Sequence, residues 1–318
     1  MKHLTDLASV HLSQPSVVTI GVFDGVHQGH QHLIRRVVDE ARMTNRLAVA
    51  LTFFPHPDIL LRKLTGRYYL TTPEQRAEYL GELGIDYVIT LPFNDEFRQI
   101  RAATFVDMML ENLKLSRLWV GADFALGYQR EGNVEFLKAQ GEAKGFAVQV
   151  IDLLPAEKDG AISSTTIREA LLAGEVEKAK DLLGRSYSLT GEVVHGDHRG
   201  RELGFPTANV HVWEEQVIPA NGIYATWAYL DGERHMAATS VGVRPQFNGE
   251  DVRVEAYLLD FDRDIYGKQL TVTFEKYLRP EMKFDGLDGL IAQIHTDVET
   301  TREYLTEQSN GTSSVKSS

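Results

Sequence analysis

The chain has 318 residues, no cysteine and a formal charge of -12 at neutral pH. Its length favours two domains, and the lack of cysteine excludes disulfides, cysteine-ligated zinc and thiolate catalysis. The acidic balance argues against a nucleic-acid partner, because phosphate backbones require a basic footprint. Small phosphorylated ligands remain compatible with it, since they need only a local group of donors.

Membrane insertion is also disfavoured. No apolar run approaches the roughly 20 residues needed to cross a bilayer. The N-terminal residues show neither an apolar signal core nor a small-residue cleavage pattern. We therefore expect a cytoplasmic protein without a membrane partner.

The first half of the chain alternates short apolar runs with segments of helical periodicity. Strands are expected at residues 17–23, 47–54, 85–91, 118–121 and 146–153, and helices at residues 31–44, 73–83, 104–113 and 133–144. Thr72 is suited to cap the second helix, and Pro73 fits its first turn. Because strands and helices alternate, we expect a parallel sheet covered by helices on both faces.

The pattern changes near Ser163. Short helices are expected at residues 167–173 and 176–183, and strands at residues 187–194, 222–229, 237–243, 252–259 and 270–277. Asp231 and Gly232 form a tight hairpin signal. Regularly spaced short strands predict a closed antiparallel barrel, followed by a helix at residues 287–306. The predicted domains are residues 1–184 (α/β), residues 185–307 (β-barrel with a terminal helix) and a polar, disordered tail at residues 308–318.

The segment FDGVHQGH, residues 23–30, joins an expected strand to an expected helix. Its histidines, His27 and His30, should therefore lie at the carboxyl edge of the sheet, where ligands bind in open α/β folds. The helix N-terminus offers free N–H groups to phosphate, and Gly25 and Gly29 allow a close backbone approach. This order favours hydrogen-bond stabilisation of a transferred nucleotidyl group. A chance pair of loop histidines, or a metal pair, is the alternative.

A second cluster, ISSTTIR, spans residues 162–168. Ser163 and Ser164 are suited to cap the following helix. The same helix N-terminus is suited to bind phosphate, with Arg168 neutralising a leaving pyrophosphate. Both interpretations hold together, because a cap and an anion site share one geometry.

An HxGH turn followed far downstream by ISSTTIR resembles the nucleotidyltransferase superfamily, which implies a Rossmann-like domain. With TFFPHP (residues 52–57) and GADFALGYQREG (residues 121–132), the set resembles the adenylyltransferase module of bacterial bifunctional riboflavin kinase/FMN adenylyltransferases, or FAD synthetases. The resemblance implies catalytic roles for His27, His30, Ser164 and Arg168. It implies nucleotide contacts from Gly21, Phe23, Gly25, Gly29, Asp123, Ser163 and Thr165. It implies flavin contacts from Phe54, Pro55, His56, Pro57 and Phe124.

The residues selected in the loops at 52–57 and 121–132 also have an ordinary structural interpretation, as turn-forming prolines, a capping aspartate or a core phenylalanine. Leu126 departs from the pattern, because the family commonly has an aromatic residue there. In such a module the FMN phosphate attacks the α-phosphorus of ATP without a strong general base. Positioning, Mg²⁺ and charge neutralisation carry the reaction.

No P-loop and no protein-kinase signature occurs in the sequence. The candidate for a second phosphate site is GEVVHGDHRGRELGFPTAN, residues 191–209. Its glycines, Gly196, Gly200 and Gly204, would let the loop wrap phosphates through backbone N–H groups. Thr207 and Asn209 offer oxygen ligands for Mg²⁺. An ordinary glycine-rich loop between barrel strands is the alternative.

GFPTAN, at residues 204–209, resembles the flavokinase signature. Later segments match that family in order, namely GIY, VGVRP, VEAYLLDF, YG and LRPEMKF. The resemblance implies that Glu255 is the general base for the 5′-hydroxyl of riboflavin and that Arg279 and Phe284 contact the flavin. An outward-facing strand carboxylate is the alternative for Glu255. Gln246 stands where the family often has threonine.

The sequence thus predicts an enzyme that makes FMN from riboflavin and FAD from FMN, with ATP as co-substrate in both steps and Mg²⁺ as the metal. A single active module is one alternative. A flavin- or nucleotide-sensing protein is another, although it would not need both transfer-competent clusters.

Overall fold

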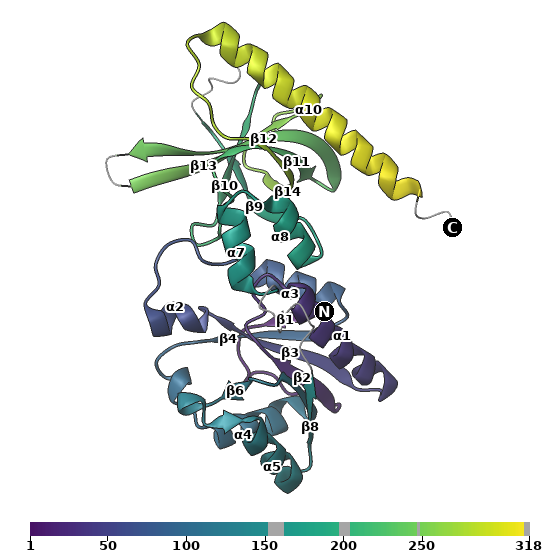
Figure 1. Cartoon of the computed structure of the whole chain (residues 1–318). Helices are drawn as coiled ribbons and strands as arrows, with labels where there is room; N and C mark the ends of the chain where they lie inside the picture. The colour runs from purple at the N-terminus through teal and green to yellow at the C-terminus, as the bar shows by residue number, and fades with distance from the viewer. Residues whose placement is uncertain (152–161, 197–203, 247–248, 315–318) are drawn as a thin grey trace. The chain divides into compact units, whose positions relative to one another are not determined.

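The computed structural model describes residues 1–151, 162–196, 204–246 and 249–314 (Figure 1). The chain divides into two compact units, Met1–Thr166 and Ile167–Ser318. This division falls inside helix α7 (Ser164–Leu172). The domain boundary after residue 184 stays a prediction.

The first unit is built on a six-stranded, wholly parallel sheet with the strand order β1-β4-β3-β2-β5-β8. The strands are β1 (Lys2–Leu4), β2 (Ser16–Ile20), β3 (Leu47–Phe54), β4 (Tyr87–Pro92), β5 (Leu115–Gly121) and β8 (Ala147–Ile151). The helices are α1 (Gln28–Met43), α2 (Pro57–Arg62), α3 (Pro73–Glu82), α4 (Ala102–Leu113) and α5 (Val134–Lys144). Short 3-10 turns η1 (Phe97–Gln99) and η2 (Tyr128–Arg130) and the strand pair β6 (Ala125–Leu126) and β7 (Gly132–Asn133) complete it.

Two hydrophobic cores cover the two faces of this sheet. Val18 of β2 packs in one core with α4 and α5, and Val17 packs in the other with α1 and α3. Successive strand side chains point to opposite faces, so each buried strand supplies both cores. The predicted parallel sheet with helices on both faces is therefore confirmed.

The start of α3 shows why these helices begin where they do. Thr72 Oγ1 accepts a hydrogen bond from the Gln75 backbone N–H at 3.2 Å, and Gln75 Oε1 accepts one from the Thr72 N–H at 3.1 Å. This reciprocal capping box satisfies two N–H groups at the start of the helix. The predicted cap at Thr72 is confirmed.

The second unit is a closed, six-stranded antiparallel barrel with the order β10-β13-β12-β11-β14-β9. Its strands are β9 (Tyr187–Val194), β10 (Ala208–Val212), β11 (Gly222–Leu230), β12 (Glu233–Gln246), β13 (Gly249–Leu258) and β14 (Gln269–Arg279). Helix α8 (Val176–Leu183) packs against β14 and β9, and α10 (Leu287–Ser314) packs against β11 and β12 (Figure 1). The predicted barrel and terminal helix are confirmed.

The hairpin between β11 and β12 has the turn that its sequence predicts. Leu230 pairs with Glu233, and both turn residues have positive φ, 51° at Asp231 and 84° at Gly232. A two-residue turn of this kind matches the twist of the flanking strands.

Helix α10 corrects the expected C-terminal end. The sequence predicts a helix up to residue 306 and a disordered tail from residue 308, but α10 continues to Ser314. Leu305 is fully buried against the barrel, Ser309 Oγ donates to the Leu305 carbonyl at 2.9 Å, and Gln308 Nε2 donates to Tyr304 at 2.8 Å. A helix that is already packed extends at the cost of ordering one residue per added hydrogen bond, so a polar composition alone does not end it.

Gly191 fixes the close approach of β9 and β10. A Cβ atom built there would lie 2.1 Å from the His211 carbonyl oxygen. We expect Gly191→Ala to lower the free energy of unfolding of the barrel by about 2 kcal/mol or more, because two backbones would have to separate. Urea unfolding followed by circular dichroism measures this. The control Gly286→Ala, which enters open space, should change the free energy by less than about 0.5 kcal/mol, and equal effects would contradict the prediction.

Candidate active sites

The turn after β2 lies at the point where the strand order of the sheet reverses. The chain runs from β2 to β3 and β4 on one side and returns to β5 and β8 on the other. Ligands of open α/β sheets bind at such a switch point, outside the carboxyl ends of the strands. The turn of residues 23–30, which includes the first residues of α1, occupies this position.

The two predicted histidines lie together at the start of α1. His27 is the N-cap, and its Nδ1 atom accepts a hydrogen bond from the His30 backbone N–H at 3.4 Å. The two imidazole rings stack with centroids 3.6 Å apart, and the ring of Phe23 meets His30 edge-on at 5.3 Å. A Cβ atom at Gly21 would clash with the Phe23 ring at 2.7 Å. Phe23 is buried, so its side chain supports the His30 ring from below the surface.

Asp24 anchors this turn and was missed by the sequence analysis. Its buried carboxylate accepts hydrogen bonds from the backbone N–H groups of Leu70 (3.0 Å) and Thr71 (3.2 Å). The Gly25 N–H donates in turn to Thr71 Oγ1 at 3.2 Å. A buried carboxylate that accepts several N–H bonds is held rigidly, so Asp24 fixes the backbone between β2 and the histidines.

The two predicted phosphate segments meet at this turn. Ser164 Oγ donates to the Asp24 carbonyl oxygen at 2.9 Å, across 140 residues of sequence. Ser163 Oγ accepts from the Thr166 N–H at 3.1 Å in the manner of a helix cap, while Thr165 is exposed. Arg168 is buried and lies four residues after Ser164, on the same side of α7.

The predicted flavin loop forms an aromatic cluster with two tyrosines that the sequence analysis did not select. The Phe54 ring lies 5.6 Å from that of Tyr69, and the His56 ring lies 5.1 Å from that of Tyr68. The His56 N–H donates to the Tyr69 hydroxyl at 2.9 Å, and its Nδ1 atom caps α2 by accepting from the Asp58 N–H at 3.0 Å. Pro55 follows Phe54 through a cis peptide bond, and Pro57 is the first residue of α2.

The GADF loop joins β5 to the small β6–β7 strand pair. Asp123 is exposed, and its carbonyl accepts from Arg130 Nη2 at 2.9 Å. Phe124 is half-buried and packs against the core that the sheet forms with α4 and α5. Leu126, the departure from the family pattern, packs beside Gly132, where a Cβ atom would lie 2.9 Å from its Cδ1 atom.

In the second unit, the structure brings the predicted kinase residues together on adjacent strands. Thr207 Oγ1 donates to Glu255 Oε2 at 3.4 Å, and Asn209 of β10 lies directly opposite Glu255 of β13. The Asn209 side chain lies against Gly196, where a Cβ atom would be 2.3 Å from Nδ2. The neighbours Val254 and Ala256 are buried, so Glu255 faces outward from the barrel, on the same side as Thr207 and Asn209.

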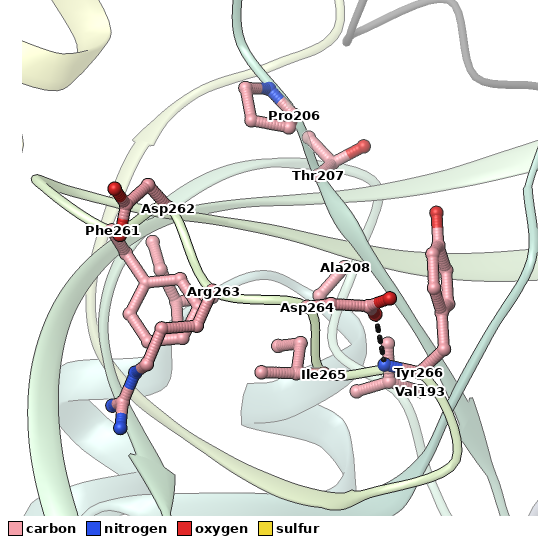
Figure 2. A pocket seen from close by; sticks show the side chains of 11 residues that line it. Val193, Pro206, Thr207, Ala208, Phe261, Asp262, Arg263, Asp264, Ile265 and Tyr266 are labelled. Atoms are coloured by element: carbon pink, nitrogen blue, oxygen red, sulfur yellow. Dashed lines mark hydrogen bonds between the residues drawn. The ribbon is translucent and has the colours of Figure 1, made fainter.

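A pocket of about 300 Å³ adjoins Thr207. It is lined by Val193, Pro206, Thr207, Ala208, Leu258, Phe261, Asp262, Arg263, Asp264, Ile265 and Tyr266 (Figure 2). The Asp264 carboxylate accepts a hydrogen bond from the Tyr266 N–H at 3.1 Å, which stiffens the wall (Figure 2). The His195 ring packs over Tyr266 with centroids 3.9 Å apart. Among the lining residues, Asp262, Arg263, Asp264 and Ile265 lie outside every segment selected from the sequence, because nothing in their spacing marks a ligand site.

The remaining predicted residues are more scattered. Arg279 forms a two-bond ion pair with the buried Asp297 of α10, at 2.8 and 2.6 Å. Phe284 is half-buried, 3.8 Å from the position that a Cβ atom would take at Gly289. Gly204 has a φ of 86° and is exposed. Gly200 and the side chain of Gln246 lie outside the described part of the chain.

Within the described residues, no group of three or more histidine, aspartate or glutamate side chains is arranged to hold a metal ion. None of the described helices is both long enough and apolar enough to span a bilayer.

Comparisons with known proteins match both units. Residues 10–166 match the FAD synthetase family, and residues 183–305 match the riboflavin kinase family. Three relatives are bifunctional riboflavin kinase/FMN adenylyltransferases. The Listeria monocytogenes protein is 38% identical over 91% of this chain and 92% of its own. The Escherichia coli K12 protein is 37% identical over 91% and 92%, and the Bacillus subtilis protein is 33% identical over 94% and 98%.

A solved structure has the same fold over nearly the whole chain. It is described as a macrolide-efflux protein from Streptococcus pneumoniae, with a TM-score of 0.86 and 32% sequence identity. The alignment covers 95% of this chain and 98% of that one.

The parallel sheet, with its HxGH turn bonded to Ser164, and the closed barrel, with its Thr207–Glu255 pair, are the two modules of a transferase. The chain belongs to the family of bacterial bifunctional riboflavin kinase/FMN adenylyltransferases. It is an enzyme of FAD biosynthesis that carries both a riboflavin kinase domain and an FAD synthetase domain.

Proposed function

We propose that adenylyl transfer to FMN takes place at the turn of residues 23–30, and that riboflavin is phosphorylated beside Glu255. The main support for the first assignment is the hydrogen bond of Ser164 to Asp24, which joins the two phosphate-type segments. The main support for the second is the contact between Thr207 and Glu255. Residues 1–184 would act as the adenylyltransferase and residues 185–307 as the kinase, in keeping with the family matches at 10–166 and 183–305.

In the adenylyl step, an FMN phosphate oxygen attacks the α-phosphorus of ATP, and the bond from that phosphorus to the bridging oxygen of pyrophosphate breaks. His27 and His30 would donate hydrogen bonds to the phosphate oxygens as charge builds there. The N-terminus of α1 adds the positive end of the helix dipole, which favours bound phosphate. Arg168 would neutralise the leaving pyrophosphate, and the rings of Phe54 and His56 offer apolar faces to the flavin.

In the kinase step, the 5′-hydroxyl oxygen of riboflavin attacks the γ-phosphorus of ATP, and ADP leaves. Glu255 would accept the proton of that hydroxyl. Its carboxylate lies on a strand, and the Thr207 contact limits its motion. A base on a rigid element is positioned more precisely than one on a loop. The pocket beside Thr207 would take part of the nucleotide.

Mg²⁺ fits the donors that are present in the barrel. Thr207 supplies a hydroxyl and Asn209 an amide oxygen beside the Glu255 carboxylate, and Mg²⁺ in such enzymes uses one or two protein oxygens together with substrate phosphates. When bound, Mg²⁺ neutralises phosphate charge and orients the phosphates for transfer. The site proposed here therefore needs no cluster of acidic residues.

Removal of Mg²⁺ should stop both riboflavin phosphorylation and FAD formation, whereas Thr207→Val should affect only riboflavin phosphorylation. We expect this variant to need about 10-fold more Mg²⁺ for half-maximal riboflavin phosphorylation, because one hard oxygen ligand is lost. The Mg²⁺ dependence of FAD formation from FMN should not change. The matched control Thr296→Val, on the exposed side of α10, should leave both dependences unchanged. An unaltered Mg²⁺ requirement in Thr207→Val would remove Thr207 from the metal site.

A chromatographic time course of the whole chain with ATP and Mg²⁺ tests the function as a whole. Starting from riboflavin, FMN should appear before FAD, and starting from FMN, FAD should form directly. Flavin binding without release of ADP or pyrophosphate would contradict the proposal and favour a sensing protein. We further propose a cytoplasmic location without nucleic-acid or membrane partners, which is consistent with the acidic charge of the chain.

A further inference from the structure

Arg76 of α3 is fully buried at the carboxyl end of the parallel sheet. Its Nη1 atom donates to three oxygens, the carbonyls of Val22 (2.8 Å) and Phe53 (3.0 Å) and Oγ1 of Thr52 (3.0 Å). The hydroxyl of Thr52 donates to the same Val22 carbonyl at 2.8 Å. A single nitrogen therefore ties together the ends of β2 and β3.

The groups held by Arg76 lie at the roots of two loops. Val22 immediately precedes the turn of residues 23–30, which carries His27 and His30. Phe53 immediately precedes the loop of residues 54–57. Any shift of these two carbonyls would change the spacing between the turn of residues 23–30 and the loop of residues 54–57.

The electrostatic state of Arg76 is unusual for a core side chain. Burial lowers the pKa of its guanidinium, and the nearby Asp24 carboxylate opposes that effect. Arginine nevertheless stays protonated in proteins, so the core holds a charge. Its Nε and Nη2 atoms have no hydrogen-bond partner among the described residues. An apolar side chain of similar volume often stabilises a core at least as well as a buried charge does, so stability alone does not account for arginine here.

We propose that Arg76 is a positioning residue for adenylyl transfer, which sets the distance between the turn of residues 23–30 and the flavin loop by fixing the carbonyls of Val22 and Phe53. This inference rests on the proposed assignment of adenylyl transfer to that turn. Arg76 touches neither substrate, since its side chain is fully buried. It acts through the backbone of both loops.

The contacts also predict which substitution is tolerated. All three acceptors are served by the two N–H groups of Nη1, one of which is shared, and a lysine ammonium carries three donors. Arg76→Lys therefore keeps the charge and the number of donors that the three oxygens need. Arg76→Met keeps much of the apolar volume and loses every donor. Arg98→Met is the matched control, because Arg98 is exposed and its ion pair with Asp95 at 3.2 Å involves neither strand end.

The test is steady-state kinetics of FAD formation from FMN in the full chain, with riboflavin phosphorylation measured in the same samples. We expect Arg76→Met to lower kcat by roughly 30-fold to 100-fold, because small displacements of reacting groups are costly. The KM for ATP should change by less than about 3-fold, because the groups that contact the nucleotide remain. Arg76→Lys should keep kcat within about 5-fold of the wild type, and Arg98→Met should be unaffected.

Three results would overturn the inference. The first is a normal kcat in Arg76→Met, and the second is an equal loss in Arg76→Lys and Arg76→Met. The third is a fall of riboflavin phosphorylation in proportion to FAD formation, which would indicate general unfolding. If Arg76→Met does not fold, the Arg76→Lys result decides. A variant that lacks His27 and His30 tests the assignment of adenylyl transfer to the turn of residues 23–30, and it should lose FAD formation. A failure of that assignment can therefore be distinguished from a failure of the inference about Arg76.

Discussion

Glu255→Gln should lower the kcat of riboflavin phosphorylation by on the order of 10³-fold, within the usual contribution of a general base. Glutamine keeps the size of the side chain but cannot accept the proton of the riboflavin 5′-hydroxyl. FAD formation from supplied FMN should keep its wild-type rate, because Glu255 lies in the barrel unit. Separate assays that start from riboflavin and from FMN measure the two rates.

Glu192→Gln is the matched control for this variant. Glu192 is an exposed carboxylate of β9, a neighbour of β10 in the same barrel. Both rates should stay normal in it. A parallel fall of both reactions in Glu255→Gln, with unchanged unfolding, would refute the division of the two activities between the modules.

The double variant His27→Asn/His30→Ala should show the opposite pattern. FAD formation from FMN should fall by about 10³-fold or more, because loss of a single donor to a developing oxyanion already costs about 10²-fold to 10³-fold. Asparagine at position 27 retains an N-cap acceptor for α1, so the helix start is preserved while the imidazole is lost. A reaction started from riboflavin should stop at FMN, and the accumulation of FMN is the readout.

His32→Ala serves as the control on the same helix. His32 lies two residues beyond His30, and residues with this spacing do not share a helix face. Its FAD formation should be normal. Continued FAD formation in the double variant would require the adenylyl site to be sought elsewhere in the first module.

The elements that the sequence predicts best are those with strong, local signals. Residues 47–54, 176–183 and 187–194 were predicted with the bounds that β3, α8 and β9 have, because turn residues flank each of them. The strands β1 and β10 were not predicted. They have three and five residues, which is too short for alternation to stand out, and each is stabilised by pairing with a distant strand.

The residues of the candidate sites also divide into those with a local sequence signal and those without one. A strand, a glycine-rich turn and a helix in the right order were sufficient to place His27 and His30. Asp24 and Arg76 were not identified, since each acts on groups far away in the sequence. Arg76 precedes Leu80 by four residues, and Leu80 is fully buried. Helical periodicity could have placed Arg76 on the buried face, but it does not reveal the carbonyls that it contacts.

Asn209 of β10 and Glu255 of β13 are paired across neighbouring strands, and this placement affects how the two activities can evolve. The proposed kinase groups are held by a strand ladder, in which an insertion or deletion would reverse the faces of all the side chains beyond it. The proposed adenylylation groups lie mostly on turns between strands and helices, where changes of length and sequence are tolerated more readily. Among descendants of such a gene, new nucleotide or flavin preferences should therefore arise more often in the adenylylation module, while the kinase chemistry is inherited with little change.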